Sequence, residues 1–277
     1  MPKSGKAAAT VILIFFGLLA FREWRLGPDG NLRLHFLSVG QGDSTLVILP
    51  SGQKIMIDGG PDWSALAEAG EKIPFLDRRI DLLVLSHPDK DHMLSFPEFL
   101  RRYEIGAILL AGVKDSNPKY LEILALSREK NIPVIIKKAG ETLSLPDQVS
   151  LSLIWPPKHL PKTFGSDANE ASLVMLFKWH DHRVLFTGDI GQKVETALVA
   201  AKADLKADIL KIAHHGSRMS SATGFLVAVN PSLALISVGS DNTYGHPHPS
   251  IINRLNKLDI PVHRTDLSGS LLITWER

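Results

Sequence analysis

Four side chains that could bind a metal ion lie within six residues of one loop: His87, Asp89, Asp91 and His92. Two imidazoles and two carboxylates offer nitrogen and oxygen donors, which suit a divalent cation of borderline hardness. The chain has no cysteine that could compete for such an ion. A polar surface loop whose aspartates cap the next helix is the plainer alternative. We favour a metal site because further acids and histidines recur in the same setting along the chain.

The other candidate ligands share one setting, because most of them follow an apolar run that is typical of a strand. Loops at strand ends, held by a rigid sheet, are where catalytic residues tend to lie. A carboxylate between two imidazole-rich groups can bridge two cations, an arrangement that suits hydrolysis of a phosphate ester. The candidates are Asp58 after residues 54–57, Asp189 after residues 183–187, His214 and His215 after residues 209–213, and His246 in the loop of residues 244–249.

Only one of the adjacent histidines His214 and His215 is expected to point into the site. Neighbouring residues of a strand face opposite sides of the sheet, so one imidazole would bind the metal while the other supports it. Which of the two is the ligand stays open at this point.

The element that positions the main cluster is the run Leu-Leu-Val-Leu-Ser at residues 82–86. A continuous apolar run closed by a turn signal at His87-Pro88 is typical of a buried strand. Similar runs alternate with helical patterns, such as the amphipathic stretch at residues 120–130. No linker after residue 29 is long enough to separate two globular domains, so residues 29–277 are expected to form one domain.

Composition indicates a folded globular protein but does not indicate what it binds. The chain has 277 residues, 44% of them hydrophobic, and a formal net charge of +2. This is ample for a real core, whereas so small a net charge gives no argument for nucleic acid. Three lysines, Lys202, Lys206 and Lys211, are spaced along one apparent helix, and a solvated face is their plainest interpretation.

The N-terminus carries an uncharged apolar run at residues 7–21, preceded by Lys3 and Lys6 and followed by Arg22 and Arg25. A bilayer-spanning helix needs about 20 mainly apolar residues, so this run is short, and a signal-peptide core is an alternative to a membrane anchor. A small-x-small cleavage site is absent, which favours an uncleaved anchor over residues 1–28. The two lysines favour a cytoplasmic N-terminus with the remaining chain outside the cytoplasm.

Together these motifs resemble the metallo-β-lactamase superfamily, whose signature is His-x-His-x-Asp-His with further Asp and His downstream. More narrowly, they are similar to the C-terminal hydrolase domain of the ComEC family, the competence channels for DNA uptake. The blocks that carry this resemblance are Leu-Ser-Val-Gly-Gln-Gly-Asp-Ser at 37–44, Leu-Ser-His-Pro-Asp-Lys-Asp-His at 85–92, Thr-Gly-Asp-Ile at 187–190, His-His-Gly-Ser at 214–217 and Asn-Thr-Tyr-Gly-His-Pro at 242–247.

The resemblance implies a four-layer αββα sandwich with two metal ions at one edge. It assigns one ion to His87 and Asp89 and the other to Asp91, His92 and His215, with Asp189 as the bridge. It also implies that Asp58 orients ligands from behind, as outer partners of metal ligands commonly do. His246 would bind or protonate the leaving oxygen, and Asn169 occupies the place that ComEC-like chains give to an Asn-rich motif.

Two positions depart from the superfamily pattern. Asp89 replaces the second His of the signature, which trades nitrogen for a harder oxygen and should favour Mn²⁺ or Mg²⁺ at the expense of Zn²⁺. The middle His expected before Asp189 has no counterpart, since residues 169–172 read Asn-Glu-Ala-Ser. We therefore expect two divalent ions, Zn²⁺ or Mn²⁺ with Mg²⁺ as a further candidate, and few ligands for the first.

The function that this sequence predicts is a membrane-anchored, metal-dependent phosphodiesterase that uses an activated hydroxide to cleave single-stranded DNA outside the cytoplasm. A DNA-channel protein is the expected partner. Two alternatives stay open: a hydrolase of a small phosphodiester or a lactone, and a non-catalytic module that scaffolds a DNA channel. The same fold supports many activities, so fold alone does not choose between them.

Overall fold

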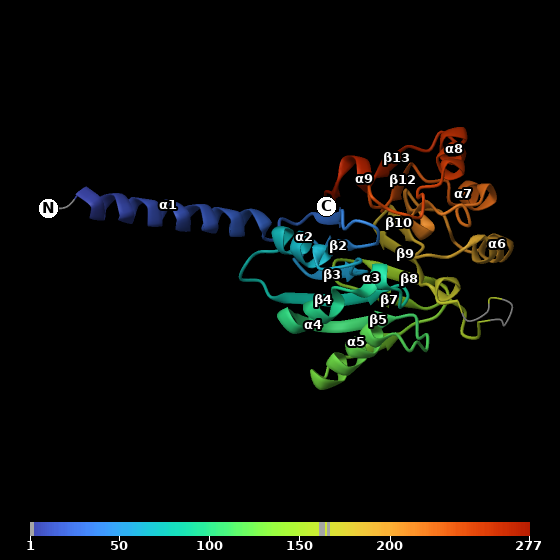
Figure 1. The fold of residues 1–277 in the computed structure, drawn as a ribbon, viewed down its shortest axis with the longest axis horizontal. Coiled ribbons are helices and arrows are strands. Elements are labelled where there is room, and N and C mark those ends of the chain that lie inside the picture. The colour runs from blue at the N-terminus through green and yellow to red at the C-terminus, as the bar shows by residue number, and fades with distance from the viewer. Residues whose placement is uncertain (1–2, 161–163, 165–166) are drawn as a thin grey trace.

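The computed structural model describes residues 3–160, 164 and 167–277, and these form two seven-stranded sheets packed face to face with helices outside both (Figure 1). This is the expected four-layer αββα arrangement, which is confirmed. The first sheet has the order β14 (Leu271–Trp275), β1 (Leu32–Phe36), β2 (Thr45–Ile48), β3 (Lys54–Ile57), β4 (Arg79–Leu85), β5 (Glu104–Leu110) and β6 (Val134–Ile136).

The second sheet mirrors the first in strand number. Its order is β13 (Val262–Arg264), β12 (Leu233–Ile236), β11 (Ile209–Lys211), β10 (His182–Phe186), β9 (Val174–Trp179), β8 (Ser150–Trp155) and β7 (Thr142–Ser144). Parallel pairing joins β3 to β4 and β4 to β5 in the first sheet, and β10 to β11 and β11 to β12 in the second. Because parallel strands end at the same edge, the loops that follow them gather there.

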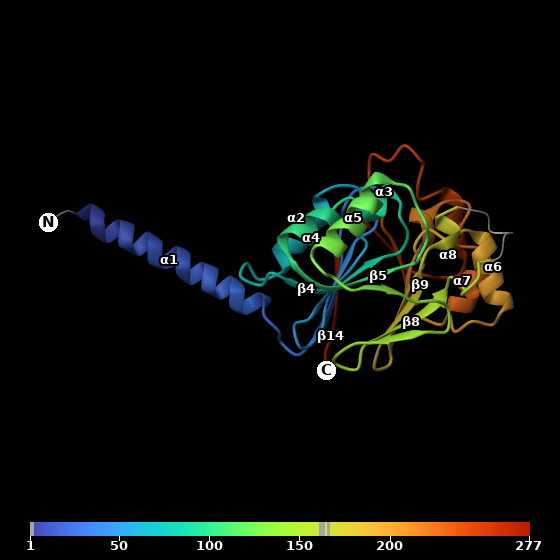
Figure 2. The same ribbon diagram turned by 90° about the horizontal axis from the view of Figure 1, so that it is seen from below.

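Helices cover the outer face of each sheet, as Figure 2 shows from below. The helices over the first sheet are α2 (Ser64–Lys72), α4 (Phe96–Arg102) and α5 (Pro118–Glu129), with the short α3 (Lys90–Met93) at its edge. Those over the second are α6 (Gln192–Ala200), α7 (Thr223–Val229) and α8 (Pro249–Lys257). The remaining short elements are the 3-10 turns η2 (Asn169–Ala171) and η3 (Ala213–Gly216), and α9 (Thr265–Ser268).

The apolar run of β4 is continuous because both of its faces are covered. Leu82 and Val84 point into the core between the sheets, whereas Leu83 and Leu85 pack against the outer helices. A strand buried on both sides loses the polar alternation that a solvent-facing strand shows. This packing fixes β4, and with it the start of the loop that carries His87.

Helix α1 (Lys3–Leu26) extends away from the sandwich in both views. Its last turn is tied to the domain, because Arg22 donates to the carbonyl of Gly70 at 3.2 Å and Glu23 accepts from the amide of Phe75 at 2.9 Å. Within the part of the chain that the structure describes, we find no helix long and apolar enough to cross a membrane.

Candidate metal centre

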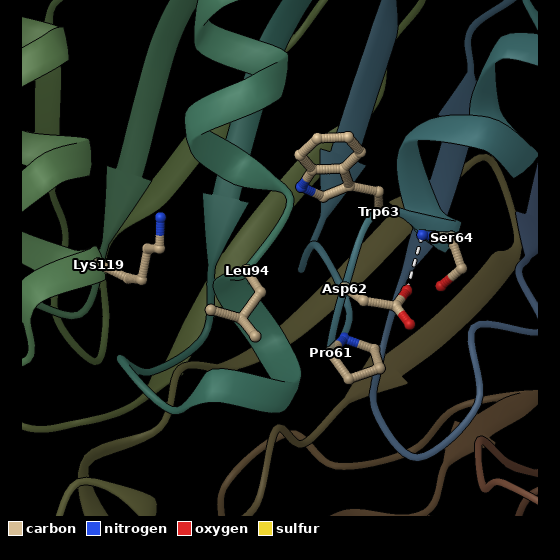
Figure 3. Close-up of a pocket in the computed structure, with 6 residues that line it drawn as sticks. All are labelled: Pro61, Asp62, Trp63, Ser64, Leu94 and Lys119. Carbon is tan, nitrogen blue, oxygen red and sulfur yellow. Dashed lines mark hydrogen bonds between the residues drawn. The ribbon is translucent and has the colours of Figure 1, made fainter.

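A surface hollow of about 580 Å³ lies beside the loop that carries the main ligand cluster. Figure 3 shows Trp63 on one side of it and Lys119 on the other, with Leu94 between them. The Asp62 carboxylate accepts a hydrogen bond from the Ser64 amide at 2.7 Å, which holds the loop before α2. None of the predicted metal ligands is among the described residues that line this hollow.

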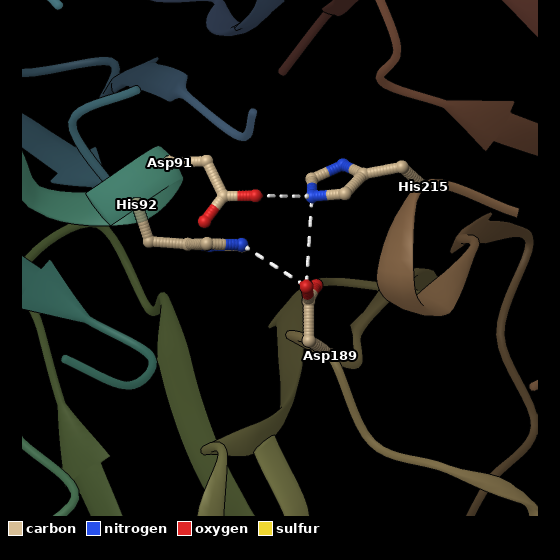
Figure 4. Close-up of side chains that lie close together, drawn as sticks. All are labelled: Asp91, His92, Asp189 and His215. Carbon is tan, nitrogen blue, oxygen red and sulfur yellow. Dashed lines mark hydrogen bonds and ion pairs between the residues drawn. The ribbon is translucent and has the colours of Figure 1, made fainter. Parts of the chain in front are cut away.

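The predicted ligands meet instead at the buried edge between the sheets. One ligand atom each of Asp91, His92, Asp189 and His215 lies within 4.8 Å of all the others (Figure 4). His215 Nε2 is 3.1 Å from Asp91 Oδ2 and 3.5 Å from Asp189 Oδ2, and His92 Nε2 is 3.4 Å from Asp189 Oδ2. Residues separated by more than a hundred positions in the chain thus share one site.

Two glycines allow the backbone to pass close to this cluster. A Cβ at Gly42 would lie within 2.3 Å of the Asp91 carbonyl oxygen, and the neighbouring Asp43 amide donates to that same oxygen at 3.1 Å. Gly188 adopts a φ of +50°, and a Cβ there would meet the Cβ of Ser172 at 2.7 Å. Only glycine combines this conformation with so close an approach, so the chain can enter the Asp189 loop.

Asp58 holds the ring of His92 from behind. Its Oδ2 lies 2.9 Å from His92 Nδ1, while Oδ1 accepts from the Ser86 amide at 2.8 Å. The Ser86 hydroxyl donates to Asp58 Oδ2, also at 2.8 Å. A carboxylate that accepts a hydrogen bond from the Nδ1–H group leaves Nε2 of the imidazole free to bind a metal. These contacts suit the orienting role predicted for Asp58.

His215, and not His214, enters the cluster. The strand β11 ends at Lys211, and both histidines lie in the η3 turn with positive φ values of 51° and 52°. We expected only one of these histidines to point into the site, on the ground that both lie in a strand. That ground was wrong, because they lie in a turn. His215 Nδ1 is 2.9 Å from the Ser237 carbonyl oxygen, which turns Nε2 toward the acids. The side chain of His214 is 33% exposed, and its Nε2 is 4.0 Å from Asp189.

The sequence did not predict that Asp43 and Lys211 form a buried ion pair between the two sheets. Our prediction that Lys211 belongs to a solvated helix face is wrong, because it lies in β11 and is 3% exposed. Asp43 Oδ1 is also 3.3 Å from His215 Nδ1. The sequence did contain one indication of this pair: a lysine lies inside the apolar run of residues 209–213, and a buried charge requires a partner.

Buried polar atoms without a hydrogen bond show that the cluster suits a cation. Among the described side chains they include His87 Nε2, His92 Nε2 and Asp189 Oδ1. Such atoms are costly to bury unless something binds them, and imidazole nitrogen with carboxylate oxygen is a donor set for zinc or manganese. The residues at this edge therefore fit a divalent metal ion.

Comparison with known proteins identifies the family. Residues 37–239 match the family model described as the metallo-beta-lactamase superfamily, and this range contains all six predicted metal ligands. The chain belongs to the metallo-β-lactamase superfamily. The solved metallo-beta-lactamase fold protein YhfI from Bacillus subtilis superposes with a TM-score of 0.56 at 12% identity, covering 88% of this chain and 99% of that one. At that identity the likeness supports the fold alone.

Two curated relatives of this superfamily member are competence proteins of the ComEC family. "ComE operon protein 3" of Bacillus subtilis is 30% identical over 263 residues, which are 89% of this chain and 33% of that protein. "Competence protein ComA" of Neisseria gonorrhoeae is 30% identical over 276 residues, or 98% of this chain and 36% of that protein. The chain thus spans about a third of the length of these relatives.

The two remaining ligands of the superfamily signature lie next to the four-residue cluster and outside it. His87 Nε2 is 3.6 Å from Asp89 Oδ2, and the ring of His87 is centred 4.2 Å from that of His92. The side chain of Asp89 is 45% exposed, so it faces solvent more than the other predicted metal ligands do. The assignment of a separate ion to His87 and Asp89 stays a prediction.

His246 and Asn169 are placed less closely. The ring of His246 is centred 5.8 Å from that of His214, and burial together with the nearby His214 and His215 lowers the pKa of His246 to about 4. Asn169 lies in η2, and its buried Oδ1 has no hydrogen-bond partner among the described residues. Both side chains stay candidates for contacts with a substrate.

Buried carboxylates set the charge of the two imidazoles in the cluster. Burial alone would lower the pKa of His215, but Asp189 and Asp43 outweigh it and raise that pKa to about 9. Burial opposes the charge of His92 in the same way, and there Asp189 and Asp58 raise the pKa well above its usual value. A cation that binds these nitrogens at neutral pH must displace their protons.

We therefore predict that Zn²⁺ or Mn²⁺ binding releases protons, with more than one proton per protein at pH 7. The affinity should rise with pH until it passes the raised pKa of His215, because the proton and the cation compete for the same nitrogens. Isothermal titration calorimetry in buffers of different ionisation enthalpy measures this number. Binding heats that do not depend on the buffer at pH 7 would contradict the prediction.

Proposed function

We propose that this chain is a metal-dependent phosphodiesterase that cleaves DNA in competence-linked uptake, with single-stranded DNA as its substrate. The observation that carries the proposal is the buried convergence of Asp91, His92, Asp189 and His215 at one sheet edge. The competence proteins among its relatives support the choice of DNA as substrate.

In this proposal each side chain has a defined task. Asp91, His92 and His215 would hold one divalent ion, His87 and Asp89 would hold a second, and Asp189 would be shared between the two groups of ligands. Bound ions of this kind lower the pKa of a water molecule and neutralise charge on phosphoryl oxygens. Asp58 keeps the His92 ring in place. His246, whose pKa is about 4, is neutral at pH 7 and can hydrogen-bond the leaving oxygen, while Asn169 offers an amide to the substrate.

The nuclease proposal predicts metal-dependent cleavage of a labelled single-stranded oligonucleotide by the purified full chain. The Asp189→Asn variant should lose about a hundredfold or more of this activity, because it weakens the carboxylate shared by both ions. The matched control is Asp181→Asn, which removes the same charge at an exposed position on the β9–β10 turn. Its activity should equal that of the wild type.

Each other outcome supports a different function. Turnover of a chromogenic phosphodiester without DNA cleavage would replace the nuclease by a small-molecule esterase. Metal analysis that finds no bound ion in either the wild type or Asp189→Ala, together with no activity on either substrate, would favour the scaffold. Failure with Mn²⁺, Mg²⁺ and Zn²⁺ alike would therefore remove the nuclease proposal.

We also propose that residues 1–28 attach the domain to a membrane, on its extracytoplasmic side and next to a channel protein. Large apolar side chains on α1 face solvent, including Leu13 at 73%, Phe15 at 62% and Trp24 at 77% exposure. An exposed apolar helix of this kind gains free energy when those side chains enter lipid.

This proposal predicts that the full chain floats with phospholipid vesicles in a density gradient. Leu13→Glu combined with Phe16→Glu should weaken vesicle binding by about a hundredfold or more, because burying each apolar side chain contributes about 1.5–3 kcal/mol. Leu267→Glu is the control, since Leu267 is 72% exposed on α9 of the sandwich. Equal binding of all three proteins would rule out attachment through α1.

A further inference from the structure

A second hollow, of about 300 Å³, lies at the same sheet edge as the metal centre. We call it the lysine groove. It is lined by segments that follow β5, β6 and β8, together with part of η2. The residues that define it here are Ala111, Lys114, Lys138, Pro156, Lys158 and Ala171.

Two walls of the lysine groove continue directly into the metal centre. Leu110 of β5 is paired with Leu85 of β4, so Ala111 follows beside Ser86, the residue before His87. Adjacent strands are about 4.8 Å apart, so the groove begins one strand spacing from the ligand loop. On the other wall, Ala171 precedes Ser172, whose hydroxyl accepts a hydrogen bond from the Asp189 amide at 3.2 Å.

The charge of the lysine groove is positive. Lys114 and Lys158 are exposed, and neither ammonium group has a hydrogen bond or ion pair with any residue that the structure describes. The Lys138 ammonium donates to the Ala111 carbonyl at 2.6 Å, which holds it against the wall. Asp167 is the one carboxylate among the described lining residues. Three lysines against one aspartate leave the surface suited to an anion.

We propose that the lysine groove binds the phosphodiester backbone of a single DNA strand and leads it to the metal centre. Ammonium groups on flexible stems act as point charges for phosphates, without reading sequence. A hollow of about 300 Å³ is at the lower end of the range for small-ligand sites, which leaves room for a short part of a strand. That the ligand is DNA rests on the proposed function. That it binds at this place rests on the lysine groove alone.

The test measures binding without cleavage. Fluorescence anisotropy of a labelled oligothymidylate is followed with the full chain in EDTA across a series of salt concentrations. The variant Lys114→Gln/Lys158→Gln should bind on the order of tenfold more weakly at about 0.1 M salt. The plot of log affinity against log salt concentration should become shallower by about 1.4, because two phosphate contacts are lost and each contributes about 0.7 on a single strand.

The matched control is Lys202→Gln/Lys206→Gln, which removes the same charge from exposed lysines. Those lysines precede β11, whose far end leads to His215, so they lie at the opposite edge of the second sheet. Its affinity should equal that of the wild type. Equal losses in both double variants would mean a general charge effect and overturn the inference, as would unchanged binding in Lys114→Gln/Lys158→Gln. Thermal melting checks that every variant is folded.

Three further outcomes separate DNA binding in the lysine groove from lipid binding there and from DNA cleavage at the metal centre. If Lys114→Gln/Lys158→Gln loses affinity for phosphatidylglycerol vesicles but keeps its affinity for the oligonucleotide, the groove binds lipid headgroups and the inference is wrong. A wild type that binds DNA through these lysines but never cleaves it overturns the proposed nuclease and leaves the groove in place. A wild type that cleaves DNA while the lysine variant binds normally overturns the groove alone.

Discussion

The structure depends on how buried carboxylates are balanced where the two sheets meet. Asp43, Asp58 and Asp189 are each at most 5% exposed, and an unpaired ionised carboxylate is very costly to bury. Each therefore contacts a cationic or proton-donating partner: Lys211 for Asp43, and histidines for Asp58 and Asp189. These contacts also orient the imidazoles, so that the Nε2 atoms of His92 and His215 both face Asp189. The contacts that balance the buried carboxylates are thus the same contacts that place the ligands of the cation site.

Strand direction brings this arrangement about. The parallel pairs β3 with β4 and β10 with β11 end at the same edge, so loops from both sheets meet there. The two outer helix layers and the core between the sheets hold those strand ends in place. Loops carried by such a rigid frame can keep metal ligands in position. The two hollows beside these loops differ in their lining: one has an exposed tryptophan and the other has lysines.

Much of this could be predicted from the sequence, because the ligands stand directly after apolar runs that mark strands. The fold and the convergence of Asp91, His92, Asp189 and His215 follow from that pattern together with the family motifs. The pair of Asp43 and Lys211 could not be found in this way, since 168 residues separate them and no local pattern joins them. The left-handed turn at His214 and His215 was missed because these are not glycines, and positive φ is rare for other residues. The lysine groove was also missed, because its lysines come from separate loops.

The central claim is that the cluster at this edge binds a divalent cation. It is tested most directly by diffraction from crystals of the full chain grown with Mn²⁺ or Zn²⁺, with data collected near the absorption edge of the metal. We predict an anomalous difference peak within bonding distance of Asp91, Asp189 and His215. Crystals that contain the metal in solution but show no peak at these side chains would contradict the account.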